Sequence, residues 1–341
     1  MIFMQNNALQ TLNEAKDNEK RSLFWEAAQK YQEALLEFNK TSGNENEKSF
    51  CKKKIREMNV EKSKEFVKSS LTSKFTEEEQ NEIEKQINST TDINDVSELL
   101  DKIGKNPNFC PSFQEVKQRA EKTMPVSFQI TNITVQDENG DQIKDGNNPK
   151  IVWFYQNYFF SQNFIILIYL LPIFNKIMDE KLTIQNLSDY FKSKGIFRED
   201  FLKILDVAIE RFFNGDYIST LHILVPKFEK VFLDLTQAIG KNADVIASRT
   251  QKGEKDKIWT QDKTLGEDFL KNEDVRKIWG EDFCEQIIFV FLSQLGHKLR
   301  HKIAHGYSKL DELNFQNSVL VFYFYLVLAA RIKRLKNNYG K

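Results

Sequence analysis

The segment 309–336 most constrains how this chain can fold, because it is apolar on nearly every face of the helix that it predicts. Its apolar residues include Leu313, Phe315, Val319–Phe322, Phe324 and Leu326–Leu328. Such a helix must be enclosed by other helices or by a second subunit. The 341 residues include only 6 Pro and 13 Gly, so helices can occupy most of the chain. We therefore predict a mainly α-helical protein, long enough for two domains.

Helical periodicity extends over both halves of the chain. Helices are expected at about 24–38, 48–70, 76–88, 93–103, 152–178, 186–193, 198–213, 217–239, 265–278, 282–300 and 309–336. In 24–38, apolar and small residues recur at spacings of three and four, which predicts one buried face. Thr76 and Glu79 form a capping box, and Asp92 is a candidate cap for the helix that follows it. Pro172 and Pro226 are expected to kink or split the two helices that contain them.

The pattern changes between the two helical regions. Residues 126–136 are rich in β-branched side chains, and 137–141 look like a turn. A small β-hairpin is therefore expected in a linker at 126–149. It separates N-terminal helical hairpins at 1–125, a regulatory or partner-binding region, from a helical domain at 150–341. The charged stretch Arg249–Lys257 is expected to be a mobile loop.

Charge, cysteine content and hydropathy narrow the class of protein. Lys+Arg and Asp+Glu both number 49, so coating of nucleic acid by overall charge is disfavoured, while a local basic patch remains open. Cys51, Cys110 and Cys284 form no CxxC pair and are expected to be small buried residues of a reducing compartment. The apolar run within Val152–Phe174 is interrupted by polar residues and is shorter than a membrane span needs, so this segment is expected to be a buried helix. We expect a soluble, cytoplasmic protein that contains no membrane segment.

Three of the four histidines lie close together, at His297, His301 and His305, and Lys298, Arg300 and Lys302 are interleaved with them. Three interpretations are open. The cations could satisfy the final carbonyls of a helix that stops at Gly306. The imidazoles, spaced four apart, could bind a metal, although the general-base Glu of HExxH is absent.

The third interpretation is metal-free cleavage of a phosphodiester. An imidazole exchanges protons near neutral pH, and a guanidinium fork binds phosphate oxygens. Arg300 and His305 are five residues apart, so they can face one cleft only if the helix ends between them. Gly306 makes that ending possible.

The stretch Arg300-His-Lys-Ile-Ala-His305-Gly306 resembles the RxxxxH signature of the HEPN superfamily. Gly215–Glu229 and the Thr264–Gly266 segment also resemble an uncharacterised bacterial HEPN-like family. The resemblance covers about 197–336 and implies a four-helix bundle there; it does not cover the first 125 residues.

The resemblance implies an endoribonuclease that needs no metal or other cofactor. His305 would be the general acid or base, Arg300 would hold the scissile phosphate, and His301 would orient the pair, with Glu229, His297 and Lys302 in supporting roles. The substrate 2′-OH would be the nucleophile, and two motifs would meet in a homodimer. The implied context is the toxic effector of a bacterial stress or anti-phage defence system.

A second class of function stays open beside this hydrolase. In it, the basic histidine cluster docks RNA or a protein partner without cutting. His222, which has apolar neighbours in the sequence, is expected to be a satisfied core histidine.

Overall fold

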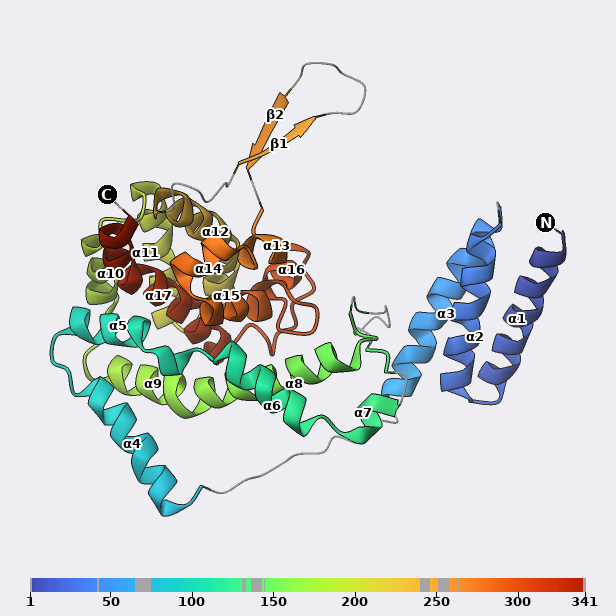
Figure 1. The fold of residues 1–341 in the computed structure, drawn as a ribbon, viewed down its shortest axis with the longest axis horizontal. Coiled ribbons are helices and arrows are strands. Elements are labelled where there is room, and N and C mark those ends of the chain that lie inside the picture. The colour runs from blue at the N-terminus through green and yellow to red at the C-terminus, as the bar shows by residue number, and fades with distance from the viewer. Residues whose placement is uncertain are drawn as a thin grey trace. The chain divides into compact units, whose positions relative to one another are not determined.

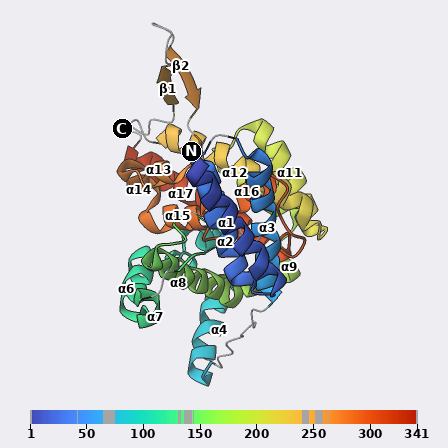
Figure 2. The same cartoon turned by 90° about the vertical axis from the view of Figure 1, so that its right-hand side faces the viewer.

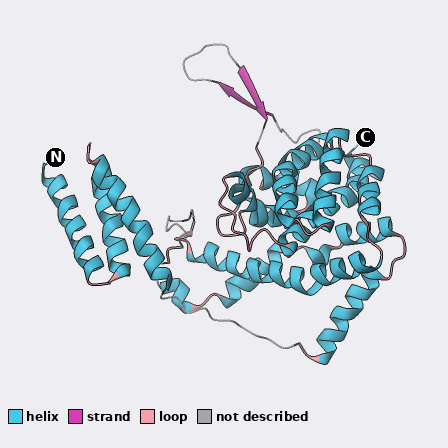
Figure 3. Ribbon diagram, turned by 180° about the vertical axis from the view of Figure 1, so that it is seen from behind, coloured by secondary structure: helices cyan, strands magenta, loops and turns pink. Residues whose placement is uncertain are grey.

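The protein is mainly helical, with a single two-stranded hairpin among the residues that the structure describes (Figure 3). The computed structural model describes residues 2–41, 43–64, 75–130, 133–135, 143, 145–239, 246–250, 258–262 and 264–339.

The chain forms two compact units whose boundaries differ from the expected domains. Unit 1 comprises Met1–Lys74 and Ser127–Val152, and unit 2 comprises Phe75–Val126 and Trp153–Lys341. Residues 75–125 therefore belong with the C-terminal part of the chain and not with the N-terminal hairpins. The packing of Gly104 against the last helix, described below, shows why.

Unit 1 contains three helices that lie side by side in both views: α1 (Ile2–Lys20), α2 (Phe24–Asn39) and α3 (Glu45–Lys64) (Figures 1 and 2). The predicted buried face of α2 is confirmed, because Ala27, Tyr31, Ala34 and Phe38 are fully buried. The Tyr31 hydroxyl donates a hydrogen bond of 2.5 Å to Glu19. The α2 face thus joins its neighbours through small residues and one satisfied tyrosine.

Unit 2 holds the remaining helices and the hairpin, with α7 and α8 each extending across the boundary of the two units. The elements are α4 (Glu77–Thr91), α5 (Val96–Lys105), the 3-10 turn η1 (Pro107–Phe109), α6 (Phe113–Thr123), α7 (Val126–Ile130), α8 (Pro149–Ile165), the π-helical turn η2 (Ile166–Leu170), α9 (Leu171–Glu180), α10 (Ile184–Ser193), α11 (Glu199–Phe213), α12 (Tyr217–Ile239), β1 (Ile246–Thr250), β2 (Ile258–Asp262), α13 (Glu267–Leu270), α14 (Glu273–Trp279), α15 (Glu281–Ile287), the π-helical turn η3 (Ile288–Leu292), α16 (Leu299–Ala304) and α17 (Phe315–Tyr339).

Helix α17 is enclosed by other helices of the same chain. Every residue from Val319 to Ala330 is at most 3% exposed, and α17 packs against α5, α9, α12 and η2. The approach of α5 is so close that a Cβ added at Gly104 would lie 2.4 Å from the carbonyl oxygen of Leu326. The sequence allowed this helix to be covered either by other helices or by a second subunit, and the structure covers it with helices of the same chain.

Helices α8 and α9 form one continuous stretch in which η2 precedes Pro172, whose ring has no N–H to donate. By length and composition this stretch, Pro149–Glu180, is the one helix among the described residues that could cross a membrane, and 33% of its most apolar window is buried. The expectation of a buried helix is met on one face only. Ile166 and Leu170 are buried, whereas Phe160 is 64% exposed.

The predicted helix 282–300 is wrong in its second half, because η3 ends at Leu292 and residues 293–298 form a loop. The loop turns back on the helix, and His297 N–H donates 3.0 Å to the carbonyl of Phe289. Only glycine fits at 296, since a Cβ there would lie 2.0 Å from that same carbonyl oxygen. The reversal positions the histidine cluster that follows.

The β-hairpin predicted at 126–149 is not seen in the described residues. Val126–Ile130 is helical, and the predicted turn at 137–141 lies outside the described residues. Val135 exchanges backbone hydrogen bonds with Ile143 and Gly146 without forming a strand. A hairpin occurs elsewhere in the chain: β1 pairs antiparallel with β2, with Ile246 opposite Asp262. Of the loop predicted at Arg249–Lys257, the first two residues belong to β1, and residues 251–257 lie outside the described residues.

The local sequence signals had mixed outcomes. The capping box of Thr76 and Glu79 is confirmed. The cap of α5 is Asp95, whose carboxylate accepts from Glu98 N–H, and Asp92 ends α4 instead. The three cysteines are free and buried, as predicted. Pro226 lies inside α12, which continues through it.

Candidate functional site

The candidate site is built around the short helix α16, which carries Arg300 in its first turn. The helix ends at Ala304, and His305 is the residue that caps it, with non-helical backbone angles. Gly306 follows with a φ of +70°, a conformation in which glycine avoids the strain of a Cβ. The helix therefore does end between Arg300 and His305, the condition that the sequence spacing set for a shared cleft.

Arg300 is fixed by a carboxylate and a backbone carbonyl. Its guanidinium forms an ion pair of 2.7 Å with Glu229 of α12 and donates 3.0 Å to the carbonyl of Leu265. Glu229 in turn accepts 2.8 Å from Leu265 N–H. The structure thus brings together two of the predicted site residues, Arg300 and Glu229, with the segment after the hairpin closing the triangle.

His301 and His305 form an exposed pair of imidazoles. Their ring centroids lie 4.4 Å apart, and Tyr307 completes a group of three rings, 5.9 Å from His301 and 6.1 Å from His305. Among the described residues, no hydrogen bond or ring contact joins Arg300 to His305. The two halves of the motif share one short helix but have different neighbours.

Positive charge surrounds His301. Its pKa is lowered by burial and then by the charges of Lys298, His305 and Arg300. His301 is therefore mainly neutral at pH 7, and a neutral imidazole can accept a proton or a hydrogen bond. The same charges create a potential that favours a phosphate.

Lys302 is already neutralised within the protein. Its ammonium contacts Glu312, and Glu312 also accepts from Lys309 N–H. Burial acts to raise the pKa of Glu312, but the contact with Lys302 and the hydrogen bond from Lys309 outweigh it and lower that pKa. The contact holds the loop after α16 against the helix, so Lys302 has a structural role here.

His297 is not part of the exposed ring group. Its ring lies edge-on to Phe289 at 5.2 Å and 5.9 Å from Phe159, and its Nε2 is buried with no hydrogen-bond partner. Burial, followed by the charge of Lys302, lowers its pKa to about 4. The supporting role predicted for His297 therefore has no geometric basis in the structure.

The remaining histidine, His222, is exposed, so the expectation of a core histidine is wrong. Its Nδ1–H donates 2.8 Å to the carbonyl of Ile218 one turn earlier in α12. The ring is satisfied by its own helix, and it belongs to no cluster in the described part of the chain.

The structure does not form the stripe of three imidazoles that a metal would need. His297 lies in the loop before α16 and turns towards phenylalanines, which leaves only His301 and His305 as neighbours. Among the described residues, no group of three His, Cys, Asp or Glu side chains could hold a metal ion.

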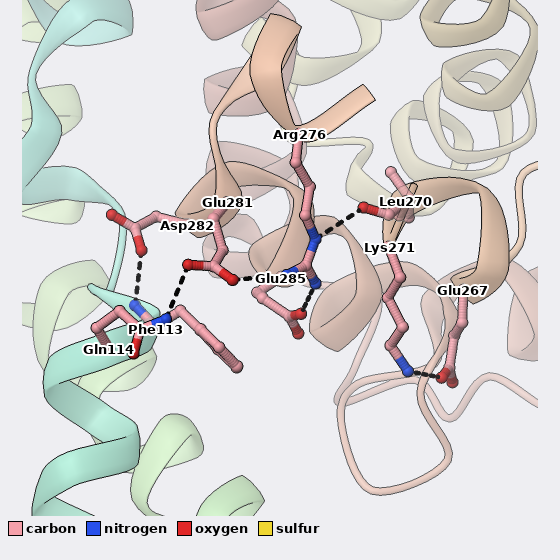
Figure 4. Close-up of polar contacts among 9 residues, drawn as sticks. All are labelled: Phe113, Gln114, Glu267, Leu270, Lys271, Arg276, Glu281, Asp282 and Glu285. Carbon is pink, nitrogen blue, oxygen red and sulfur yellow. Dashed lines mark hydrogen bonds and ion pairs between the residues drawn. The ribbon is translucent and has the colours of Figure 1, made fainter. Parts of the chain in front are cut away.

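A second polar cluster lies in unit 2, around Arg276 of α14 (Figure 4). Its guanidinium contacts Glu281 at 2.6 Å, the buried Glu285 and the carbonyl of Leu270. Burial raises the pKa of Glu285 despite the opposing charge of Arg276.

Two neighbours tie this cluster to α6. Asp282 accepts 2.7 Å from Phe113 N–H at the start of that helix, and Gln114 donates 2.9 Å to Glu281 (Figure 4). All these groups are paired with one another, so the cluster is a joint between α6, α14 and α15 and leaves no group directed at a substrate.

Comparison with known proteins adds no relative: no family model, curated protein or solved structure matches this chain. The candidate site therefore stands on its own geometry. Tyr307 was not predicted as part of the site, although it follows the motif after one glycine. Only the turn at Gly306 brings its ring back to the two imidazoles.

Proposed function

We propose that the protein is a metal-independent endoribonuclease of the HEPN type, with its site at the end of α16. The observation that carries the proposal is the ending of α16 between Arg300 and His305. That ending leaves two exposed imidazoles in contact with each other, on the same short helix as a guanidinium that Glu229 orients. These are the proton-transfer groups and the phosphate-binding group that such cleavage needs.

In the proposed reaction, the 2′-oxygen of the substrate attacks the adjacent phosphorus and the bond to the 5′-oxygen breaks. His305 transfers a proton as general acid or base, and His301 orients it through the ring contact. Arg300 stabilises the charge that develops on the phosphate oxygens. The 2′-hydroxyl gives up one proton and the departing 5′-oxygen takes one up. The products are therefore a 2′,3′-cyclic phosphate and a 5′-hydroxyl, with no net change in protons and no metal or other cofactor required.

The proposal extends to assembly and context. A homodimer would have to use a surface other than α17, which is buried in its own chain. A cytoplasmic location agrees with three free, buried cysteines. The motif is what supports a role as the toxic effector of a bacterial stress or anti-phage defence system, and the helical hairpins of unit 1 would then bind a regulator.

The test is cleavage of single-stranded RNA in the presence of EDTA by wild type, His305→Ala and Arg300→Ala. Loss of general acid–base catalysis should lower the rate by about 10²-fold or more. His222→Ala is the matched control, because His222 is exposed and its ring bonds only its own helix. Equal cleavage by all four proteins would refute the proposed site, and a product without a cyclic phosphate would refute the mechanism.

One observation favours the rival function, a non-catalytic module that binds RNA or a protein. Arg300 already has two protein partners, Glu229 and the Leu265 carbonyl, so part of its hydrogen-bonding capacity is used before any phosphate arrives. RNA binding that is lost in Arg300→Ala, with no cleavage by the wild type, would support this rival.

A further inference from the structure

Tyr307 presents an open aromatic face next to the imidazole pair. The residue is 55% exposed, and its ring is nearly parallel to that of His305, with 25° between the planes. The ring centroid of this exposed tyrosine lies within 6.1 Å of both imidazole centroids. The ring therefore lies close to both imidazoles while more than half of the residue is open to solvent.

The backbone places Tyr307 firmly, although its side chain is exposed. Tyr307 N–H donates 2.7 Å to the carbonyl of Lys302, and Gly306 N–H donates 3.3 Å to that of Ile303. With the positive φ of Gly306, this pair of bonds is the Schellman ending of a helix. The ring is thus attached to the same rigid turn that ends α16 beside His305.

The charge around the three rings suits a nucleic-acid strand. Lys298 and Arg300 are close enough to His301 to lower its pKa, and Arg300 is also paired with Glu229. In the described part of the chain, no carboxylate forms an ion pair with either imidazole. Single-stranded binding sites combine cations that follow the phosphates with aromatic faces on which bases stack. The ring of Tyr307 supplies the second of these, and the cations supply the first.

We propose that Tyr307 is a positioning residue that stacks an unpaired nucleobase of single-stranded RNA and so places the adjoining phosphate at the His301–His305 pair. This inference rests on the proposed function and adds the substrate class: the base must be unpaired, because a base within a duplex has no free face for the ring. Stacking is indifferent to base identity, so the residue selects single strands and not a sequence.

The test measures binding, so that it does not depend on cleavage. The probe is a fluorescent 12-nucleotide RNA with 2′-O-methyl groups throughout, which cannot use its 2′-oxygen as a nucleophile. Tyr307→Ala should weaken binding by roughly 5- to 150-fold, the range for one stacked base, and Tyr307→Phe should bind like wild type. Leu310→Ala is the matched control, because Leu310 is a near neighbour in the chain and 74% exposed.

A second probe of the same length has the same sugar–phosphate backbone but no bases, and so separates stacking from charge. Wild type and Tyr307→Ala should bind it equally. If Tyr307→Ala binds the RNA like wild type, or weakens both probes by the same factor, the inference is overturned. It is also overturned if wild-type protein does not bind the RNA.

The two proposals can fail separately. Base-dependent binding through Tyr307 in a protein that cleaves nothing would keep this inference and refute the nuclease. Cleavage by the wild type that is unchanged in rate and affinity by Tyr307→Ala would keep the nuclease and refute this inference. Far-ultraviolet circular dichroism of each variant excludes misfolding as the cause of lost binding.

Discussion

His297 should make the stability of unit 2 depend on pH in a way that one substitution removes. Its ring is packed against Phe289 and Phe159 with Nε2 unpaired, and its pKa is lowered to about 4. The folded protein binds a proton on His297 more weakly than the unfolded chain does. The free energy of unfolding is therefore not reduced by this protonation above about pH 6.5. That free energy falls as the pH drops from about 6.5 towards 4.

The magnitude follows from the two pKa values. With about 6.5 in the unfolded chain and about 4 in the fold, linkage predicts that the free energy of unfolding falls by about 2.5 kcal/mol at pH 4.5 relative to pH 7.5. Carboxylates also titrate in this range, so the informative quantity is the difference between wild type and His297→Phe. A phenyl ring keeps the aromatic packing and cannot be protonated.

The assay is urea unfolding at pH 7.5, 6.0, 5.0 and 4.5, followed by circular dichroism and analysed for each unit, because two units need not unfold together. His297→Phe should lose about 2.5 kcal/mol less than wild type by pH 4.5. His222→Phe, at an exposed position, should retain the wild-type pH dependence. Parallel curves for wild type and His297→Phe, or an NMR titration that places His297 near 6.5, would refute the reasoning.

Two further predictions concern the framework of the site. Glu229→Ala removes the partner of Arg300 and the acceptor for Leu265 N–H, so the free energy of unfolding in urea should fall by about 1–3 kcal/mol. Glu229→Gln should lose less stability because it keeps an acceptor. No loss in either variant would mean that the contacts do not persist in solution. Gly296→Ala should destabilise the protein by about 3 kcal/mol in thermal unfolding, because its Cβ would lie 2.0 Å from the Phe289 carbonyl oxygen. Gly306→Ala, where the added Cβ meets nothing within 4 Å, should cost only the left-handed strain of about 1–2 kcal/mol, and equal losses at the two glycines would contradict the packing argument.

The sequence predicted those features that depend on near neighbours in the chain. The spacing of Ala27, Tyr31 and Phe38 identified a buried helix face, since side chains three and four apart share one side of a helix. Thr76 and Glu79 cap each other within one turn. A helix that is apolar on nearly every side, as α17 is, had to be enclosed. The ending of α16 shortly before Gly306 was also local, because glycine tolerates a positive φ.

Contacts between distant segments decided the rest. The helix predicted through 300 instead stops at Leu292, because Gly296 lets the chain fold back onto the Phe289 carbonyl. That reversal separates His297 from the other two imidazoles, which the even spacing of four could not reveal. The pairing of β1 with β2, on either side of the predicted loop, was likewise not predicted from the sequence.

The same distinction holds within the candidate site. The sequence by itself determined its chemistry: which imidazoles, which guanidinium and which carboxylate were available, with Glu229 as a candidate supporting residue. Only the fold paired that carboxylate with Arg300. Only the tertiary structure decided that Leu265 closes that contact through its backbone, that Lys302 is neutralised by Glu312, and that Tyr307 joins the histidines. The physical reason is that residue types are encoded one position at a time, whereas a partner is set by the packing of whole helices.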